Sequence, residues 1–139
     1  MWNRATFRRL LPVPVIGMVH CRALPGAPGW EGDMAAVVAS ALADARALAD
    51  GGVGALMLEN YHDIPFFPRE VPAETTAALT RVAVALRGAC PDLPLGINML
   101  RNDAHAALAV AAAVGAAFVR VNVLVGAAVT DQGLIEGRA

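Results

Sequence analysis

The chain has 139 residues, enough for one domain, since domains most often contain about 100–150 residues. Apolar residues make up 57% of it, more than the usual ~45–50%, and this excess favours segments that are buried on two faces. The net charge is −1 and the eleven basic residues, all Arg, are scattered along the chain, which excludes a concentrated basic surface for nucleic acid.

Two cysteines and two apolar segments bear on the location of the protein. Cys21 and Cys90 lack partners at metal-binding spacing and predict no disulfide framework. Residues 8–21 contain two prolines and lack a cleavage site, and residues 106–119 are only fourteen residues long, whereas a spanning helix needs ~20. We therefore expect a cytoplasmic protein without a transmembrane segment, which could still associate peripherally with a complex at the cytoplasmic face of a membrane.

The first half of the chain predicts an irregular segment followed by two strand–helix units. Residues 1–12 are expected to be irregular, and residues 13–20 form the first strand, because a β-rich run gives way there to the turn-forming LPGAPG. Residues 33–52 predict a helix that Asp33 caps and a glycine pair ends. Residues 55–60 predict the second strand, and the next helix opens near Pro72 and runs to about Ala89. The apolar stripe of the first helix comprises Val38, Leu42, Ala45 and Leu48.

The second half continues the same alternation. Residues 94–100 predict the third strand, and the helix after it is capped by Asn102 or Asp103 and ends at Gly115. Residues 118–123 predict the fourth strand. A polar loop with Thr130, Asp131 and Gln132 follows, and then the start of a fourth helix.

Alternating strands and helices predict a parallel sheet, as in an open flavodoxin-like fold or a piece of a (β/α)8 barrel. Side chains alternate between the two faces of a strand, so one predicted face is wholly aliphatic and the other becomes polar toward each strand's C-terminal end. An open sheet covered by helices on both sides would need two apolar faces. The sequence therefore predicts an α/β domain that is a piece of a (β/α)8 barrel.

The polar face carries the candidate functional residues. His20, Glu59, Asn98 and Asn122 should converge near the barrel mouth, with Arg120 one layer below Asn122. Such a ring can bind a polar ligand, hold a divalent ion, or place a general acid or base. The alternative is structural: Arg120 and Glu59 can form a buried ion pair, and Asn98 can satisfy backbone groups.

Two residues are candidates to move a proton. Glu59 comes first, because a carboxylate at a partly dry barrel mouth can serve as a general acid or base. His20 comes second, because histidine changes charge near physiological pH. A nucleophilic pair of His20 and Cys21 is not expected, since successive side chains of a strand diverge. The sequence carries no motif for a metal or a nucleotide, so the cofactor is unknown and no metal ligand is predicted.

Three long stretches carry a resemblance to a known family. VIGMVHCRALPGAPGW, GGVGALMLENYHDIPF and the segment from LGINMLRND to AAVTDQGLIEGRA resemble the BtpA/SgcQ family in the same order and at similar separations, from Val15 onward. The chain departs from the family pattern at Cys21 and His62. The resemblance implies a barrel related to the ribulose-phosphate-binding group. It also implies that family chains are longer and that these residues are their N-terminal half, so that residues 1–139 form one incomplete domain, the N-terminal half of a (β/α)8 barrel.

The resemblance also implies a set of site residues, most of them at strand ends and in the loops that follow. Catalytic roles would fall to Glu59, His20 and Asp131. The substrate-binding residues would be Asn60, Asn98, Arg101, Asn102, Asp103, Arg120, Asn122, Thr130 and Gln132.

Three functional hypotheses remain open. The first is an enzyme that, in its intact form, acts on a phosphorylated sugar or nucleoside-like small molecule, because some family members are described as nucleosidase-like or sugar-metabolism proteins. The second is a non-catalytic assembly or stability factor for a membrane complex of the photosystem I type. The third is a truncated gene product without activity.

We predict that residues 1–139 prepared alone form a homodimer or aggregate at micromolar concentration. The first and fourth strands would be unpaired edges, which template association. The inward side chains of Ile16, Met18, Met57 and Phe118 would contact water, and exposing such side chains forfeits up to ~1.5–3 kcal/mol each. Analytical ultracentrifugation measures the association. A sharp monomer peak, with unfolding independent of concentration, contradicts the prediction.

Overall fold

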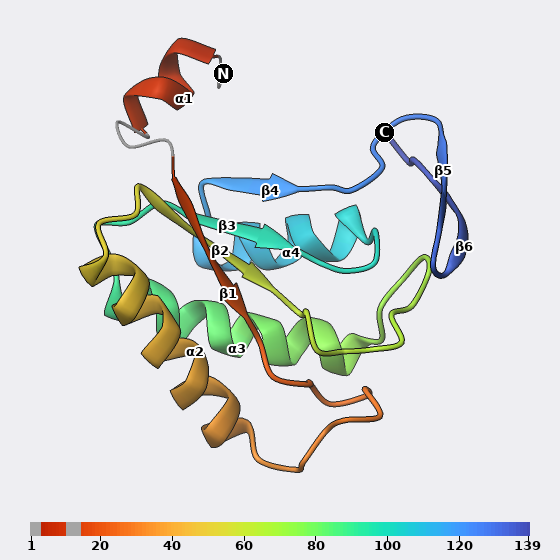
Figure 1. Ribbon diagram of the computed structural model, residues 1–139, viewed down its shortest axis with the longest axis horizontal. Helices are drawn as coiled ribbons and strands as arrows, with labels where there is room; N and C mark the ends of the chain where they lie inside the picture. Colours follow the sequence, from red (N-terminus) through yellow and green to blue (C-terminus); the bar gives the residue numbers. More distant parts are fainter. Residues whose placement is uncertain (1–3, 11–14) are drawn as a thin grey trace.

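The computed structural model describes residues 4–10 and 15–139 and contains one four-stranded parallel sheet. Its strands are β1 (Ile16–His20), β2 (Ala55–Glu59), β3 (Leu95–Asn98) and β4 (Phe118–Arg120), and they lie side by side in chain order (Figure 1). The first three strands are each followed by the helical crossover that the alternating pattern predicts, as in half of a (β/α)8 barrel. The predicted fold class is therefore confirmed.

Three helices pack on one face of this sheet: α2 (Met34–Asp50), α3 (Ala73–Ala89) and α4 (Ala104–Val114) (Figure 1). The core between the helices and the sheet contains the predicted aliphatic face, with Leu56, Leu58 and Ile97 all at most 1% exposed. In α2 the fully buried residues are Val37, Ala41 and Ala45, while the predicted Val38, Leu42 and Leu48 pack at the margin of the core. None of the helices in the described ranges is long and apolar enough to cross a membrane.

Capping fixes where two of these helices begin. The Asp33 side chain accepts hydrogen bonds from the backbone N–H groups of Ala35 and Ala36, at 2.8 and 3.0 Å, as predicted. Of the two candidates for α4, the cap is Asp103, which accepts from the N–H of Ala106 at 2.9 Å. Gly115 ends α4 with a φ of 65°, in the left-handed region that glycine adopts without strain.

The N-terminal segment departs from the expectation. Residues 4–10 form a short helix, α1 (Arg4–Leu10), where we predicted an irregular segment. Long polar side chains such as Arg are good helix formers, and Arg8 and Arg9 lie in its last turn, where positive charge is favourable. The remainder of the predicted irregular segment, and residues 13 and 14 of the predicted first strand, lie outside the described residues.

The predicted start of a fourth helix is wrong. The chain after β4 instead forms an antiparallel hairpin, β5 (Ala127–Thr130) and β6 (Gly133–Glu136). Gly133 has a φ of 89° and the Thr130 hydroxyl donates to its carbonyl at 3.0 Å, which closes the turn between the strands. The β-branched pair of Val129 and Thr130 also favours a strand over a helix.

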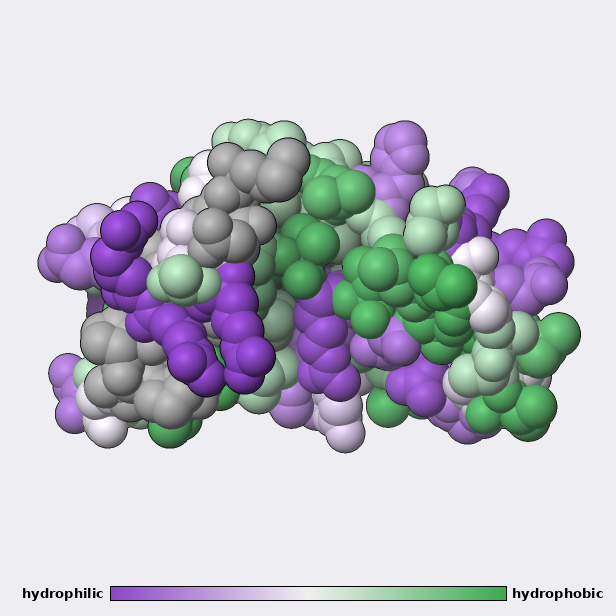
Figure 2. Space-filling model, turned by 90° about the horizontal axis from the view of Figure 1, so that it is seen from above, coloured by the Kyte–Doolittle hydropathy of each residue, from purple (hydrophilic) through white to green (hydrophobic). Residues whose placement is uncertain are grey.

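The hairpin and the loop before it expose apolar side chains. Figure 2 shows apolar side chains gathered over the segment after β4 and at the right-hand end of the molecule, where Figure 1 places the hairpin. The side chains of Leu124, Val125, Val129 and Leu134 are all more than half exposed, and Val129 reaches 87%.

The strands align without a slip, so side chains of the open face form level rows. Met18, Met57, Gly96 and Phe118 make up one row. Met57 is only 4% exposed, which corrects the expectation that it would contact water, whereas Ile16, Met18 and Phe118 are half-buried. The ring of Phe118 lies across Gly96, so that a Cβ on that glycine would meet the ring at 2.3 Å. The Phe118 ring therefore lies in the same row as Met57, on a face that we had expected only strands outside residues 1–139 to cover.

We predict that Gly96→Ala destabilises the fold by about 1–3 kcal/mol, because the added methyl displaces a packed ring. Gly88→Ala is the matched control: Gly88 lies near the end of α3 with nothing within 4 Å of its added Cβ, so the change should be neutral or stabilising by up to ~1 kcal/mol. Urea unfolding followed by circular dichroism measures both. Equal midpoints for the two variants would mean that Phe118 moves aside freely.

Candidate functional site

A row of polar side chains lies at the C-terminal ends of the four parallel strands. His20, Glu59, Asn98 and Arg120 are the last residues of β1 to β4, and each is aligned with its neighbour in the sheet. Strand parity predicted His20, Glu59 and Asn98 on this face, and the register confirms that geometry. We call these four residues the polar row.

The fourth member of the row corrects the prediction. Arg120 is level with Asn98, in the place where we expected Asn122. The predicted strand ran to residue 123, but β4 ends at Arg120. Side chains alternate between the two faces only within a strand, so the alternation does not place Asn122. Asn122 is exposed and its Nδ2 donates to the carbonyl of Arg101 at 2.9 Å.

Glu59 is the buried centre of the polar row. Its residue is 4% exposed, and one carboxylate oxygen, Oε1, accepts from Asn98 Nδ2 at 2.6 Å and from Arg120 Nη1 at 3.1 Å. The other oxygen, Oε2, lies 3.4 Å from His20 Nε2. The side chains of Arg120 and His20 are 55% and 38% exposed. The negative charge is therefore enclosed, while the two groups that can carry positive charge are partly exposed beside it.

A first set of polar residues ties the loops that follow the strands. Asn60 is 1% exposed; its Oδ1 accepts from Leu100 N at 2.7 Å, and its Nδ2 donates to Asp63 Oδ2 at 3.0 Å and to the Leu100 carbonyl at 3.3 Å. Asp63 also accepts from Leu24 N at 2.7 Å, so the pair connects the loops after β1, β2 and β3. Burial raises the pKa of Asp63 above its usual value, and the hydrogen bonds from Leu24 and Asn60 oppose that rise. The Asn60 amide is thus occupied within the protein.

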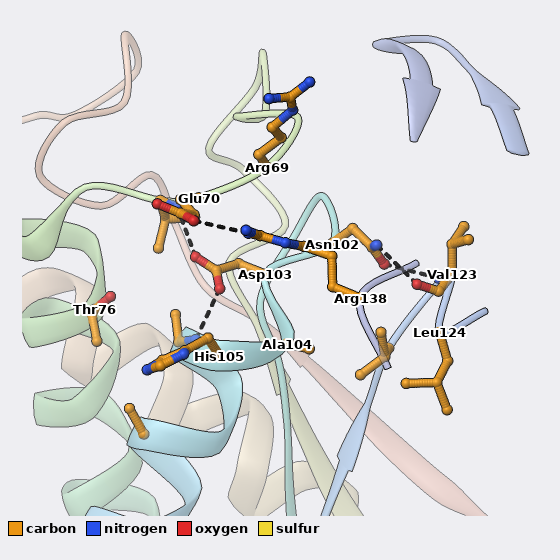
Figure 3. Close-up of a pocket in the computed structure, with 14 residues that line it drawn as sticks. Arg69, Glu70, Thr76, Asn102, Asp103, Ala104, His105, Val123, Leu124 and Arg138 are labelled. Carbon is orange, nitrogen blue, oxygen red and sulfur yellow. Dashed lines mark hydrogen bonds and ion pairs between the residues drawn. The ribbon is translucent and has the colours of Figure 1, made fainter. Parts of the chain in front are cut away.

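A second set ties the loop after β3 to the chain after β4. Asn102 accepts from Val123 N at 2.8 Å and donates to the carbonyls of Val123 and Glu136 at 3.0 and 3.3 Å. Asp103 accepts from Val71 N at 2.9 Å as well as capping α4. Figure 3 shows Asn102 directed at Val123 while the Asp103 carboxylate lies between Glu70 and His105. Both predicted substrate-binding residues therefore act here as structural ties.

The remaining predicted residues form a charged rim at the hairpin. Arg101 Nη2 pairs with Asp131 Oδ1 at 2.8 Å, and Gln132 Nε2 donates to Asp131 Oδ2 at 2.7 Å. The guanidinium of Arg101 also lies 5.9 Å from the centre of the Phe66 ring. Thr130 closes the hairpin turn, as described above, and also accepts from Gln132 N at 3.3 Å. Among the described residues, the partners of Asp131 are thus Arg101 and Gln132, and Glu59 is not one of them.

A cavity of about 600 Å³ lies away from the polar row, beside the first turn of α4. Asn102, Asp103, His105, Leu124 and Arg138 are among the residues that line it (Figure 3). Val121, which we expected to pack under a helix, borders this cavity. Across its mouth Arg138 pairs with Glu70 at 2.8 Å, which lowers the pKa of Glu70 and raises that of Arg138. Because no member of the polar row borders it, the cavity does not define the candidate site.

One aromatic residue at the site was missed by the sequence reasoning. The ring of Tyr61 stacks on the imidazole of His20, with centroids 4.1 Å apart and planes inclined by 10°. The ring of His62 meets the same tyrosine edge-on, at 5.4 Å and 89°. The available signal was position: Tyr61 comes two residues after Glu59, in the loop that follows a strand of the predicted polar face.

The geometry of residues 4–10 and 15–139 shows no metal centre, and it encloses the thiol of Cys21. Within these ranges no three or more His, Cys, Asp or Glu side chains are arranged to hold a metal ion. Cys21 is fully buried in the core on the helix-covered side, so its side chain diverges from that of His20 as expected. The pKa of the Cys21 thiol is raised to about 12, mainly by burial and with contributions from the nearby charges of Asp63 and Asp44.

The fold and the polar row define a (β/α)8-type chain with a charged cluster at the carboxyl ends of its strands, where such barrels place their active sites. Residues 12–139 match the model of the BtpA family, and the chain belongs to this family.

Relatives of the chain are found in bacteria and archaea. It is 49% identical over 126 residues to the photosystem I biogenesis protein BtpA of Synechocystis, covering 91% of this chain and 44% of that protein. It is 51% identical to an uncharacterised protein of Thermococcus kodakarensis, covering 91% and 48%, and 38% identical to the sgc region protein SgcQ of Escherichia coli, covering 86% and 44%. The chain thus spans about half the length of these relatives. No solved structure matches it.

We predict that iodoacetamide at pH 8.5 modifies half-buried Cys90 while Cys21 stays unmodified until the protein unfolds. The folded-state pKa of Cys21, about 12, lies above the ~8.5 of an unfolded cysteine. The stability that its neutral thiol contributes is therefore present below the unfolded value and is lost as the pH rises toward the folded one. Peptide mass spectrometry over a pH series measures both thiols, and equal rates of modification in the native protein would contradict the burial of Cys21.

Proposed function

We propose that the polar row is the reaction centre of an enzyme that, in its intact form, acts on an anionic small molecule of the phosphorylated-sugar or nucleoside-like class. The observation that carries this proposal is the enclosed Glu59 carboxylate, held at the carboxyl ends of parallel strands between His20, Asn98 and Arg120. Catalytic residues of (β/α)8 enzymes come from the ends of several different strands.

The charge distribution supports an anionic ligand. One guanidinium nitrogen of Arg120 contacts Glu59, and the side chain is still 55% exposed, so further N–H donors are available to a ligand. A planar guanidinium that a carboxylate holds in place suits phosphate or carboxylate oxygens. At the rim, Arg101 is paired with Asp131 but remains partly exposed, and would offer a second positive charge.

Proton transfer is the role proposed for Glu59 and His20. They face each other across 3.4 Å, a distance that a bound ligand can tighten into a hydrogen bond. Glu59 would carry the proton, His20 would assist it, and Asn98 would orient the carboxylate. Asn60, Asn102 and Asp103 are hydrogen-bonded between loops, so we do not assign them to substrate binding. The substrate would instead be bound by Arg120 and by four residues near the hairpin, Arg101, Asn122, Thr130 and Gln132. Asp131 would hold Arg101 in place through their ion pair.

A second candidate function is that of an assembly or stability factor. The relative that is 49% identical is named for photosystem I biogenesis. In this case the polar row would be structural, with Glu59 and Arg120 serving as an ion pair that holds β2 and β4 in register.

We predict that Arg120→Gln weakens the binding of inorganic phosphate or a phosphorylated sugar by about 10- to 100-fold, because one charge-assisted hydrogen bond is lost. Arg81→Gln, on the exposed side of α3, is the matched control and should leave binding unchanged. Isothermal titration calorimetry of the protein that contains this chain measures both. Phosphorylated compounds that bind wild type and Arg120→Gln equally would rule out the anion-binding role.

The catalytic part is tested by Glu59→Gln, which keeps the shape of the side chain and removes its charge. For a substrate identified by binding, turnover should fall by ~10²–10⁴ while circular dichroism shows an intact fold. A structural row instead predicts a lower unfolding midpoint with unchanged turnover. That outcome would remove Glu59 from the catalytic role.

A further inference from the structure

The stacked pair of Tyr61 and His20 connects the loop after β2 to the polar row. Their planes are nearly parallel, and the histidine directs Nε2 toward Glu59 Oε2, 3.4 Å away. His20 is the last residue of β1, and among the described residues this strand pairs with β2. An imidazole at such a position can turn about its side-chain bonds unless something fixes it.

Tyr61 is well placed to fix it, because the loop that carries it is itself held. Asn60, the preceding residue, is buried and hydrogen-bonded to Leu100, and Asp63 is hydrogen-bonded to Leu24. The N–H of Asp63 also donates to the Asn60 carbonyl at 3.2 Å, which closes a turn around residues 61 and 62. The edge of the His62 ring then meets Tyr61. The loop backbone therefore holds Tyr61 beside His20, where the two rings stack.

We propose that Tyr61 is a positioning residue that sets the rotamer and tautomer of His20, a role that rests on the proposed function of the polar row. With the ring held by stacking, Nε2 is the nitrogen that faces the carboxylate, and a proton on Nε2 is stabilised there. Nδ1 is then the nitrogen with the free lone pair. The orienting contact thus decides which nitrogen can accept a proton from a ligand, as in other carboxylate–histidine pairs.

The size of the stacking effect on the rotamer population of His20 can be stated. Stacked aromatic pairs shift an equilibrium by about 2- to 10-fold beyond the effect of their buried area. Removing the tyrosine ring should lower the population of the Glu59-facing rotamer of His20 by about that factor. Removing only its hydroxyl should leave the stack intact, since neither ring contact involves the oxygen.

The test is histidine tautomer analysis by NMR of the full chain, with ¹⁵N-labelled histidine and His20→Gln for assignment. In the wild type at neutral pH we expect the His20 signals of a proton on Nε2 and a bare Nδ1. Tyr61→Phe should keep them. Tyr61→Leu should move them toward a mixture of the two tautomers, and should also remove the ring-current shift of the His20 carbon-bound protons. Phe67→Leu, an exposed aromatic residue of the same loop, is the matched control and should change neither.

A second measurement does not depend on a stable Leu variant. Tyr61 is the only tyrosine of the chain, so 3-fluorotyrosine labelling gives one ¹⁹F resonance. In a His62→Gln background, which removes the other imidazole in contact with Tyr61, this resonance should move as the pH is varied around neutrality. His20→Gln should abolish the movement, while His105→Gln, on α4, should not. The positioning role is overturned if the ¹⁹F resonance shows the same pH dependence with and without His20. It is also overturned if His20 of the wild type carries its proton on Nδ1.

The two proposals fail separately. If phosphate binding and turnover are unaffected by Arg120→Gln and Glu59→Gln while the tautomer still depends on Tyr61, the polar row is not the reaction centre, although the stack orients His20. If both of those variants lose function while the tautomer is the same in Tyr61→Leu and in the wild type, the reaction centre stands and Tyr61 has no part in it.

Discussion

The burial of one carboxylate, that of Glu59, is the constraint on which the arrangement of the strand ends depends. A charge removed from water destabilises the fold by several kcal/mol unless partners satisfy it. Two of those partners, Asn98 and Arg120, come from the next two strands, and the third, His20, comes from the strand on the other side. The contacts require the four strands to end level, and a slip of a single residue would turn the partners to the opposite face.

Level strand ends in turn bring the loops close enough to be tied. Asn60 immediately follows Glu59, and its side chain bonds the loop after β3. Asn102 does the same for the chain after β4. An amide suits such a tie because it donates and accepts at once, and so satisfies a backbone N–H and a carbonyl that would otherwise be buried without partners. Two adjacent residues therefore have different roles: Glu59 lies on the open face of the sheet, and Asn60 connects the loops after β2 and β3.

Much of this arrangement follows from local rules, and what does not follow depends on contacts distant in the sequence. Alternation of side chains was sufficient to place Leu56 and Leu58 on the helices and His20, Glu59 and Asn98 on the other face. Capping chemistry located the start of α2 at Asp33. The roles of Asn60 and Asn102 were not predictable, because their partners lie 40 and 21 residues away. The end of β4 was misplaced by three residues, since nothing local distinguishes Arg120 from Val123 as the last paired position.

That last difference changes the chemistry of the site. With Asn122 in the row, the face would present two amides and one carboxylate, a set suited to neutral hydroxyl groups. With Arg120 in its place, the carboxylate is matched by a permanent positive charge. The orientation of the imidazole, between Glu59 on one side and Tyr61 on the other, becomes the property that a reaction at this site would depend on.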